Sequence, residues 1–502
     1  MAEVFSIDAR TRESVEAVAD ESTSADIDDV VARAVAAQPQ LMALDRRSRA
    51  LMLRAVARAL DEDGEAIVAL ADRETALGET RLRGELARTV AQFEHFAEVL
   101  DDGAFLEVAI DSETDSHPEI RRMMRPIGTV AVFGAANFPL AFSVPGGDVA
   151  SALAAGCAVV AKAHPSHPAT SERCARAIRV GLDRSSMPVE AIGLIHGARA
   201  GSLLVEHPDI AGVGFTGSLN GGRALFDLAT SRERPIPFYG ELGSVNPMVV
   251  GEAAARRRGE SIAHDFFASF TLGLGQFCTK PGLLFVPDES MAIVRDTISE
   301  AVLGQTPGVL LNTGIAAAYE RRVDELRARD ISLVTSRHGL ASGCSNGATV
   351  VFADIAELVG DPSNLLADEC FGPFTIVVGY SDHDQLEATL RKLPSALTAT
   401  LQCDDDDREF ARRLLPILEA GAGRIVWNGY PTGVAVTWAM HHGGPYPAST
   451  SSDTSVGATA IRRWVRPIAY QNMPAELLPE ELSHDVGRSV QRLDGRIATS
   501  AG

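Results

Sequence analysis

The 502-residue chain is poor in lysine and has no apolar run long enough to cross a membrane. Lysine occurs only at positions 162, 280 and 392, so arginine supplies nearly all of the 46 basic residues. The longest largely apolar run, Val149 to Ala161, is too short for a bilayer and predicts a buried helix, turn and strand. The first thirty residues are acidic and lack the basic and apolar regions of a signal peptide, so we expect a cytoplasmic protein.

Positive charge is scarce overall, and the formal net charge is −21. Nucleic acids and anionic membrane surfaces attract clustered cations, so we expect neither as a partner. The six cysteines show no spacing typical of a metal site and no density typical of a disulfide scaffold; they are residues 157, 174, 278, 344, 370 and 403. They are interpreted as reduced thiols, and no metal is expected.

Short β-branched runs alternate with amphipathic segments, which predicts an α/β protein built from parallel β-α-β units. Helical patterning over 26–100 precedes a first series, with strands at 127–133, 158–161, 191–195 and 212–215 and helices at 149–155, 170–182 and 201–206. A second series follows, with strands at 282–287, 374–378 and 424–428 and helices at 291–302 and 384–392. Two α/β domains are the simplest interpretation.

Two regions fit neither domain. Residues 105–110 and 119–125 are predicted strands, and an apolar-rich strand near the C-terminus contains Trp464, Val465, Ile468 and Tyr470. A lone apolar strand at an edge invites aggregation unless something covers it. The last residues of the chain are polar, which predicts a mobile tail.

Three side chains carry the chemistry of a thioester enzyme. Cys278 lies in Gly-Leu-Gly-Gln-Phe-Cys-Thr-Lys (273–280), Glu241 lies in Glu-Leu-Gly-Ser-Val-Asn-Pro (241–247), and Asn137 lies in Gly-Ala-Ala-Asn-Phe-Pro-Leu (134–140). A thiolate attacks a carbonyl, an amide donates to the oxyanion, and a carboxylate activates water. A lone cysteine is more often a small buried hydrophobe, so the interpretation depends on the three together.

The chain resembles the aldehyde dehydrogenase superfamily over nearly its whole length. Six motifs in the family's order carry the resemblance: Asn137-Phe-Pro139, Lys162, Gly214-Phe-Thr-Gly-Ser218, Glu241-Leu-Gly243, Gly275-Gln-Phe-Cys278 and Glu369-Cys-Phe-Gly-Pro373. The segments Lys162-Ala-His-Pro-Ser-His-Pro168 and His442-Gly-Gly-Pro-Tyr-Pro447 are similar to the branch of α-ketoglutaric semialdehyde and bacterial fatty-aldehyde dehydrogenases.

This resemblance implies an aldehyde dehydrogenase-like α/β fold, with two Rossmann-type parallel domains and a small β element for oligomerisation. Residues 1–104 and 128–240 would form the dinucleotide-binding domain, and 241–457 the catalytic domain. Residues 105–127 and 458–485 would form the oligomerisation element, and 486–502 the tail. A homodimer or homotetramer is expected.

The resemblance also implies NAD(P). Gly212-Val-Gly214-Phe-Thr-Gly217 matches the letters of the dinucleotide fingerprint, but its first two glycines fall inside a predicted strand. A helix beginning at Ser218 is the favoured pyrophosphate site. Pro165 stands where NAD-dependent members carry a glutamate, so we expect NADP to be accepted at least as well as NAD. The implied cofactor residues are Lys162, His164, Ser166, Gly217, Ser218, Leu242, Glu369 and Phe371.

The family's substrate tunnel corresponds here to Phe138, Phe142, Phe277, Thr279, Trp438, His441 and His442. We expect oxidation of α-ketoglutaric semialdehyde to 2-oxoglutarate. No arginine stands out among these residues to bind a substrate carboxylate, so a longer or apolar aldehyde stays an alternative. An inactive nucleotide-binding relative and an enzyme that acylates coenzyme A are further alternatives. The presence of Cys278, Glu241 and Asn137 together argues against an inactive protein.

Overall fold

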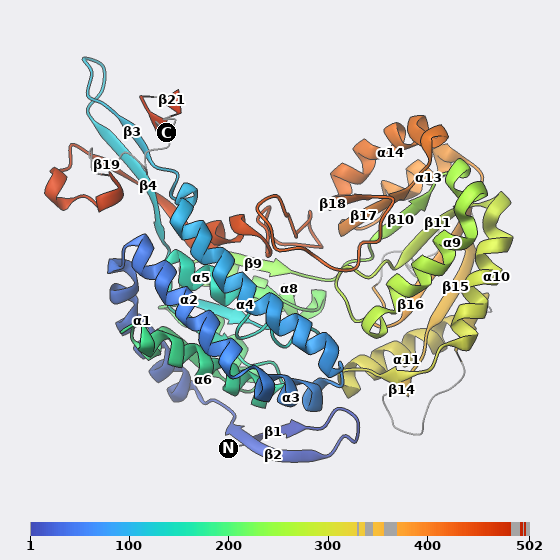
Figure 1. Cartoon of the computed structure of the whole chain (residues 1–502), viewed down its shortest axis with the longest axis horizontal. Coiled ribbons are helices and arrows are strands. Elements are labelled where there is room, and N and C mark those ends of the chain that lie inside the picture. The colour runs from blue at the N-terminus through green and yellow to red at the C-terminus, as the bar shows by residue number, and fades with distance from the viewer. Residues whose placement is uncertain are drawn as a thin grey trace.

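The computed structural model describes residues 2–328, 331–336, 345–355, 369–482, 492–494 and 496–497. Two α/β domains lie side by side, and a small sheet projects from the first of them (Figure 1). An N-terminal hairpin of β1 (Glu3–Ile7) and β2 (Ser14–Asp20) precedes the first domain. Arg12 in this hairpin donates to the backbone carbonyls of Leu310 (2.6 Å) and Leu311 (3.2 Å), so the hairpin also joins the second domain.

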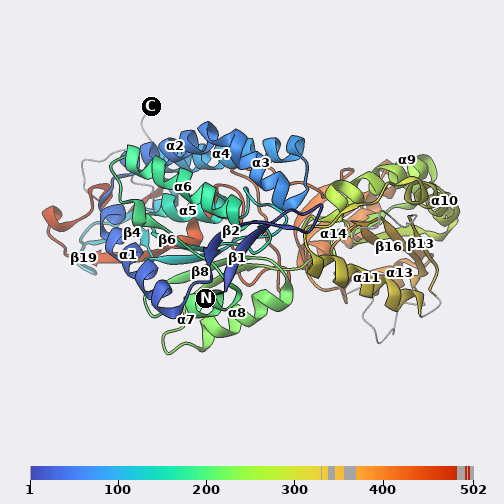
Figure 2. The ribbon, with the colours of Figure 1, turned by 90° about the horizontal axis from the view of Figure 1, so that it is seen from below.

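The first domain has a five-stranded parallel sheet in the order β7-β6-β5-β8-β9. Its strands are β5 (Val130–Phe133), β6 (Val159–Lys162), β7 (Ile192–Ile195), β8 (Gly212–Thr216) and β9 (Phe238–Glu241). Its helices are α1 (Ser24–Ala43), α2 (Arg46–Glu62), α3 (Gly64–Thr75), α4 (Glu79–Asp102), α5 (Gly147–Ala155), α6 (Pro168–Arg184), α7 (Ala198–Glu206) and α8 (Leu219–Ser231). Helices α5 and α6 cover one face under α2 to α4, and α7 and α8 cover the other (Figure 2).

The order of these strands creates a binding crevice at their carboxyl ends. The chain runs from β5 outward to β6 and β7, then returns to add β8 and β9 on the other side. In such sheets ligands bind where the direction of winding reverses, here between β5 and β8. Gly212 and Gly214 do lie inside strand β8, which confirms that they do not form the tight turn of the dinucleotide fingerprint.

The second domain has a seven-stranded sheet in the order β13-β15-β16-β11-β10-β17-β18, parallel except for β13. Its strands are β10 (Pro247–Val250), β11 (Leu283–Pro287), β13 (Leu333–Thr335), β15 (Thr349–Asp354), β16 (Phe374–Tyr380), β17 (Ala396–Gln402) and β18 (Ala422–Trp427). Its helices are α9 (Glu252–Thr271), α10 (Asp288–Gly304), α11 (Thr313–Arg327), α13 (His383–Leu390) and α14 (Arg408–Gly421). The short strands β12 (Gly308–Val309) and β14 (Ser345–Asn346) pair separately.

The projecting sheet has the order β19-β4-β3-β20-β21. It joins β3 (Ala109–Asp111), β4 (Ile120–Pro126) and β19 (Val465–Gln471) to the short strands β20 (Arg492–Leu493) and β21 (Arg496–Ile497). The predicted strand at 105–110 is wrong in its first half, because Ala104–Leu106 forms a 3₁₀ turn that buries Phe105 and Leu106. The expected tail at 486–502 is wrong at its described residues, where β20 pairs with β3.

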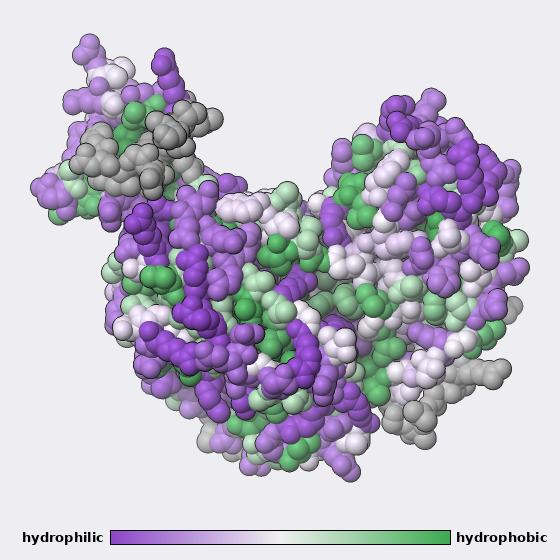
Figure 3. All heavy atoms as spheres, in the orientation of Figure 1, coloured by the Kyte–Doolittle hydropathy of each residue, from purple (hydrophilic) through white to green (hydrophobic). Residues whose placement is uncertain are grey.

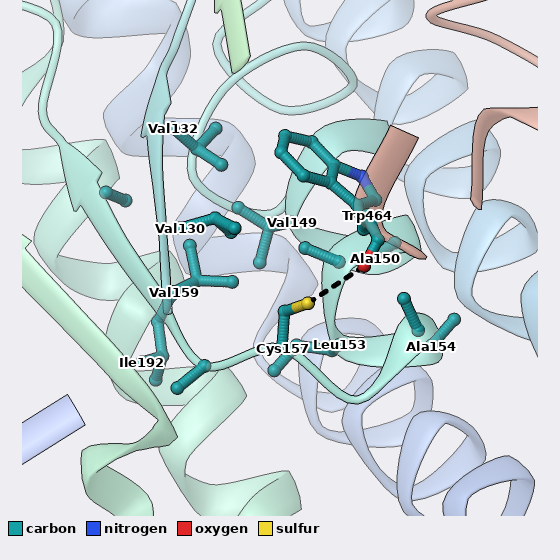
Figure 4. Packing of buried hydrophobic residues seen from close by; sticks show 14 of the residues in the cluster. Val130, Val132, Val149, Ala150, Leu153, Ala154, Cys157, Val159, Ile192 and Trp464 are labelled. Atoms are coloured by element: carbon teal, nitrogen blue, oxygen red, sulfur yellow. Dashed lines mark hydrogen bonds between the residues drawn. The ribbon is translucent and has the colours of Figure 1, made fainter. Parts of the chain in front are cut away.

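Trp464 does not belong to the apolar strand that the sequence predicts. It ends the 3₁₀ helix Ala458–Trp464 and is fully buried in the core of the first domain (Figure 4). Its indole N–H donates to Ser151 Oγ (2.8 Å), and its carbonyl accepts from the Cys157 thiol (3.3 Å). The C-terminal part of the chain therefore completes the core of the first domain.

In the described part of the chain no helix is long and apolar enough to cross a membrane. The five described cysteines form no disulfide, and Cys344 lies outside the described residues.

Trp464→Ala should lower the free energy of unfolding by about 3–5 kcal/mol, because it leaves a large cavity and removes the indole hydrogen bond to Ser151. Urea unfolding followed by circular dichroism measures the loss. Trp427→Ala is the matched control, because Trp427 is 51% exposed. Equal losses in the two variants would contradict the burial argument.

Candidate active site

Three segments that are distant in the sequence meet where the two domains face each other. Glu241 ends strand β9 of the first domain, and Cys278 follows the kinked turn Leu272–Gly275 of the second. His442 comes from the long segment between β18 and the C-terminal 3₁₀ helix. The reactive atoms of these three side chains all lie within 4.8 Å of one another. Apolar side chains line the hollow between the domains (Figure 3).

The imidazole of His442 lies between the other two groups. Its Nε2 is 3.5 Å from Cys278 Sγ and 3.0 Å from Glu241 Oε1, and Ser455 Oγ donates to Glu241 Oε2 at 2.6 Å. His442 Nδ1 is buried and has no hydrogen-bond partner among the described residues. A buried N–H without a partner is costly, so we assign the proton to Nε2, which donates it to Glu241.

Sequence reasoning expected His442 only as a lining residue of the tunnel and missed its place beside the thiol. The sequence feature that pointed to His442 was the motif His442-Gly-Gly-Pro. It indicated a branch of the family but did not indicate what the imidazole does. The same three side chains are a possible set of metal ligands. Here their hydrogen bonds to one another and to Ser455 already account for them.

Burial controls the protonation of this cluster. Burial and the negative charge of Glu241 raise the pKa of the Cys278 thiol well above its usual value. Burial also acts to raise the pKa of Glu241, but the adjacent His442 and the hydrogen bonds from His442 and Ser455 outweigh it, so that pKa is lowered. The hydrogen-bond partners of Glu241 therefore stabilise its anion.

Asn137 lies at the cysteine loop, as an oxyanion donor must. Its side-chain Nδ2 donates to the carbonyl of Gln276 at 2.9 Å. An amide NH₂ has two hydrogens, so the second is free for an oxyanion. Arg81 Nη2 donates to the Asn137 carbonyl at 2.6 Å and fixes the backbone from the other side.

Two buried residues hold the cysteine loop in place. Asn246 Nδ2 donates to the carbonyls of Cys278 (2.7 Å) and Lys280 (2.9 Å). Lys280 Nζ donates to the carbonyls of Cys370 and Phe374, each at 2.8 Å. Lys280 therefore ties the nucleophile's loop to the segment that carries Glu369.

The aromatic residues expected in the tunnel do form a cluster. The ring of Phe138 lies 5.3 Å from that of Phe142 and 5.2 Å from that of Phe277, and the Phe142 ring lies 6.2 Å from His442. Trp438 is half exposed and stacks edge-on against His95 of α4, at 5.7 Å.

Two expected tunnel residues have structural partners instead. Thr279 is buried, and its hydroxyl accepts from the Gly433 N–H at 3.3 Å. The His441 ring packs against Gly423 and Gly443, on the side of β18.

The crevice at the first sheet carries the features that a dinucleotide requires. Gly217 and Ser218 are exposed at the start of α8, where free N–H groups favour a pyrophosphate. Ser218 caps this helix by accepting from the Gly221 N–H at 3.3 Å. Lys162 ends the neighbouring strand β6, and burial lowers the pKa of its ammonium to about 8. Among the described residues its ammonium has no hydrogen-bond or ion-pair partner, so it remains available to a ligand.

The nearby histidines do not add positive charge. Burial lowers the pKa of both His164 and His167, so both rings are neutral. His164 Nδ1 accepts from the Ser166 N–H (3.1 Å), and His167 Nε2 bonds the Ala135 carbonyl (3.0 Å). Ser166 Oγ accepts from Asn312 of the second domain at 2.9 Å and keeps its own O–H free.

The remaining expected cofactor residues lie at the junction of the domains. Glu369 Oε2 accepts from the Ser244 N–H at 3.2 Å, and burial raises the pKa of Glu369 to about 7. Leu242 is buried against Gly222 of α8, and its N–H donates to the Ala448 carbonyl at 2.8 Å. Phe371 is partly exposed beside Glu369. These positions fit a nicotinamide half that reaches from the crevice toward Cys278.

A profile of the aldehyde dehydrogenase family matches residues 3–465. The chain belongs to the aldehyde dehydrogenase family. It is an NAD(P)-dependent oxidoreductase, and the resemblance drawn from the sequence motifs is confirmed.

Two relatives share much more than the fold with this aldehyde dehydrogenase. It is 43% identical over 460 residues to α-ketoglutaric semialdehyde dehydrogenase 2 of Azospirillum brasilense, and the alignment covers 89% of this chain and 87% of the relative. It is 41% identical over 467 residues to α-ketoglutaric semialdehyde dehydrogenase of Acinetobacter baylyi, which covers 90% of this chain and 88% of the relative.

Solved structures at lower identity share its fold. An NADP-dependent enzyme of E. coli superposes with a TM-score of 0.78 at 19% identity, covering 93% of this chain and 94% of that one. A protein from Burkholderia cenocepacia superposes with a TM-score of 0.79 at 21% sequence identity, and the superposition covers 95% of this chain and 96% of that one. The predicted α/β fold class is confirmed.

Glu241→Gln should lower the pKa of the Cys278 thiol, because it removes the nearby negative charge that raises this pKa. At a pH above this lowered thiol pKa, where Cys278 is already a thiolate and needs no base, it should also stop turnover after one reduced cofactor per site, because the amide cannot activate water. The pH dependence of iodoacetamide alkylation measures the first effect, and stopped-flow absorbance measures the second. Ser455→Ala is the control, because it leaves the charge of Glu241 in place. A thiol pKa unchanged by Glu241→Gln would contradict the assignment.

Proposed function

We propose that this enzyme oxidises α-ketoglutaric semialdehyde to 2-oxoglutarate through a thioester on Cys278, with NADP accepted at least as well as NAD. The observation that carries the chemistry is the contact of the Cys278 thiol with the buried Glu241–His442 pair. The substrate is supported by the two relatives above 40% identity, whose names state that activity.

The first half of the reaction forms the covalent bond. The thiol is held protonated by burial, so its proton must leave as the sulfur attacks the aldehyde carbon. The Glu241–His442 pair takes that proton as a coupled unit. The free N–H of Asn137 stabilises the oxyanion of the thiohemiacetal. Conversion of this adduct to a thioester requires a hydride acceptor, which NAD(P) held at Lys162, Ser218 and Glu369 would supply.

The second half releases the acid. Glu241 is 4% exposed and already hydrogen-bonded to His442 and Ser455, so it is positioned to deprotonate a water beside the thioester. Glu241 then passes this proton to the Cys278 sulfur, which leaves as the thiol when the tetrahedral adduct collapses. Hydrolysis by this pair would release the free acid without coenzyme A.

Steady-state assays of the wild-type enzyme with four aldehydes test the substrate. These are α-ketoglutaric semialdehyde, succinic semialdehyde, pentanal and decanal, each with NAD or NADP and with or without coenzyme A. We expect the highest kcat/KM for α-ketoglutaric semialdehyde and no requirement for coenzyme A. A higher value for decanal would establish the apolar-aldehyde alternative, and no turnover of any aldehyde would establish an inactive relative.

The acceptance of NADP is proposed from local charge. Pro165, an exposed turn residue, presents no carboxylate to a 2′-phosphate, and Lys162 offers an unpartnered ammonium nearby. Since His164 and His167 are neutral, Lys162 is the cation of this turn.

Affinity for NADP should fall with increasing pH above about 8, while affinity for NAD stays nearly constant. The Lys162 ammonium is charged below its pKa of about 8 and neutral above it, so only the 2′-phosphate loses an attraction. Fluorescence titration between pH 7 and 9.5 gives both dissociation constants. Lys162→Met should remove the difference between the two pH profiles. Parallel profiles for NAD and NADP in the wild-type enzyme would rule out this role of Lys162.

We also propose a homodimer or homotetramer that uses the projecting sheet. Strand β19 forms one edge of this sheet and leaves Ile468 and Tyr470 half-buried on one face. An edge strand of this kind in an isolated subunit leaves backbone groups and apolar side chains uncovered.

Ile468→Glu should shift the protein to a smaller species in sedimentation velocity at micromolar concentration. The charge would lie on the half-buried face of β19, whereas Ala469→Glu, on the exposed face, is the control. A truncation that removes Trp464 would open the core, so the point variant is the sharper test. A wild-type protein that sediments as a monomer would overturn the proposal.

A further inference from the structure

Helix α4 presents two arginines to the aromatic cluster of the active site. Arg81, Glu85 and Arg88 follow one another at the spacing that places side chains on one helix face. The Arg81 guanidinium lies 5.0 Å from the Phe138 ring centre and 4.8 Å from that of Phe277. The Arg88 guanidinium lies 5.3 Å from that of Phe142.

Arg88 lacks polar partners in this position. Its Nε and Nη2 are buried and have no hydrogen-bond partner among the described residues, and no described carboxylate lies within ion-pair distance. Contact with the Phe142 ring compensates only part of this loss. Buried N–H groups of a charged side chain are costly when unpaired, and a carboxylate is the partner that satisfies a guanidinium best.

Other arginines near the site are already engaged. Arg424 donates to the carbonyls of Pro431 (2.5 Å) and Gly433 (2.9 Å), and thereby supports that loop. Arg81 donates through Nη2 to the Asn137 carbonyl, and its buried Nη1 has no partner among the described residues. Of these three arginines, Arg88 has two buried nitrogens without a partner among the described residues, whereas Arg81 and Arg424 have one each.

The charge of Arg88 reaches the reacting atoms. It acts to lower the pKa of the Cys278 thiol. Burial lowers the pKa of Arg88 itself, and the charges of Cys278 and Glu241 act to raise it. Phe142 connects the two places, since its ring touches the Arg88 guanidinium on one side and lies 6.2 Å from His442 on the other. A five-carbon substrate bound at Cys278 would direct its far end along this ring.

Glu85 does not form an ion pair with Arg88. Its Oε1 accepts from the N–H groups of Leu140 (2.9 Å) and Ala141 (3.0 Å), which fixes it to the turn after Asn137. One carboxylate between two guanidinium groups leaves this face of α4 with an excess of positive charge.

We propose that Arg88 binds the distal carboxylate of the substrate, with the free Nη1 of Arg81 as a second donor. This inference rests on the proposed function, because it presumes an aldehyde that carries a carboxylate. It names the residue that sequence reasoning failed to find, since Arg88 lies far from every motif. In this role Arg88 sets specificity and takes no part in the covalent steps.

The test compares two substrates that differ in charge, α-ketoglutaric semialdehyde and pentanal, in the wild-type enzyme and in Arg88→Met. We expect kcat/KM for the semialdehyde to fall by about 100-fold, the usual effect of removing one partner of a buried charge pair. The value for pentanal should stay within a few-fold of wild type. Arg88→Lys should recover part of the loss, because it restores charge without the paired N–H geometry.

Arg83→Met is the matched control, because Arg83 lies on the same helix, is exposed, and pairs with Glu65. Calorimetric binding of 2-oxoglutarate and of pentanoate to Cys278→Ala, with and without Arg88→Met, gives a readout independent of turnover. Only 2-oxoglutarate should lose affinity when Arg88 is removed.

The outcomes separate the two proposals. If the wild-type enzyme shows no preference for the semialdehyde over pentanal, the proposed substrate is wrong. If the preference exists but survives Arg88→Met, or if both substrates lose activity equally, the role of Arg88 is overturned while the function stands. If Arg88→Met does not fold, Arg88→Gln answers the same question with a smaller change in shape.

Discussion

The hydrogen bond between Glu241 and His442 is the contact on which the active site depends. It joins the last strand of the first sheet to a segment that follows the last strand of the second, and it does so beside the nucleophile. Both side chains are almost fully buried, so each requires the other as a partner. The contact therefore ties the segment after β18 to the first sheet and places a negative charge beside the cysteine, which raises the pKa of its thiol.

The site is supported by buried polar side chains that satisfy loop carbonyls. Asn246 and Lys280 hold the loop of Cys278, Arg81 holds Asn137, and Ser455 holds Glu241. Such contacts keep reacting groups in place without contributing to the chemistry themselves. They also explain why two of the three lysines lie here: Lys280 is a compact donor to two carbonyls, and Lys162 is a point charge facing the crevice.

The surroundings of Cys278 and the face of α4 that contacts the aromatic cluster differ in chemistry. At Cys278 the surroundings are buried and hydrogen-bonded, whereas along α4 the aromatic rings are faced by guanidinium groups. A substrate with an aldehyde at one end and an anion at the other matches both ends. With this arrangement, the length of the substrate and its charge would contribute to specificity through different residues.

The sequence by itself determined the α/β class, the two series of strands and helices, and the roles of Cys278, Glu241 and Asn137 as candidates. These depend on local periodicity and on short motifs, which a chain carries without reference to its fold. It could not reveal the place of His442 beside the thiol, the burial of Trp464, or the approach of Arg88 to Phe142. Those contacts join residues far apart in the chain, so only tertiary packing decided which imidazole meets the thiol and which arginine stays unpaired.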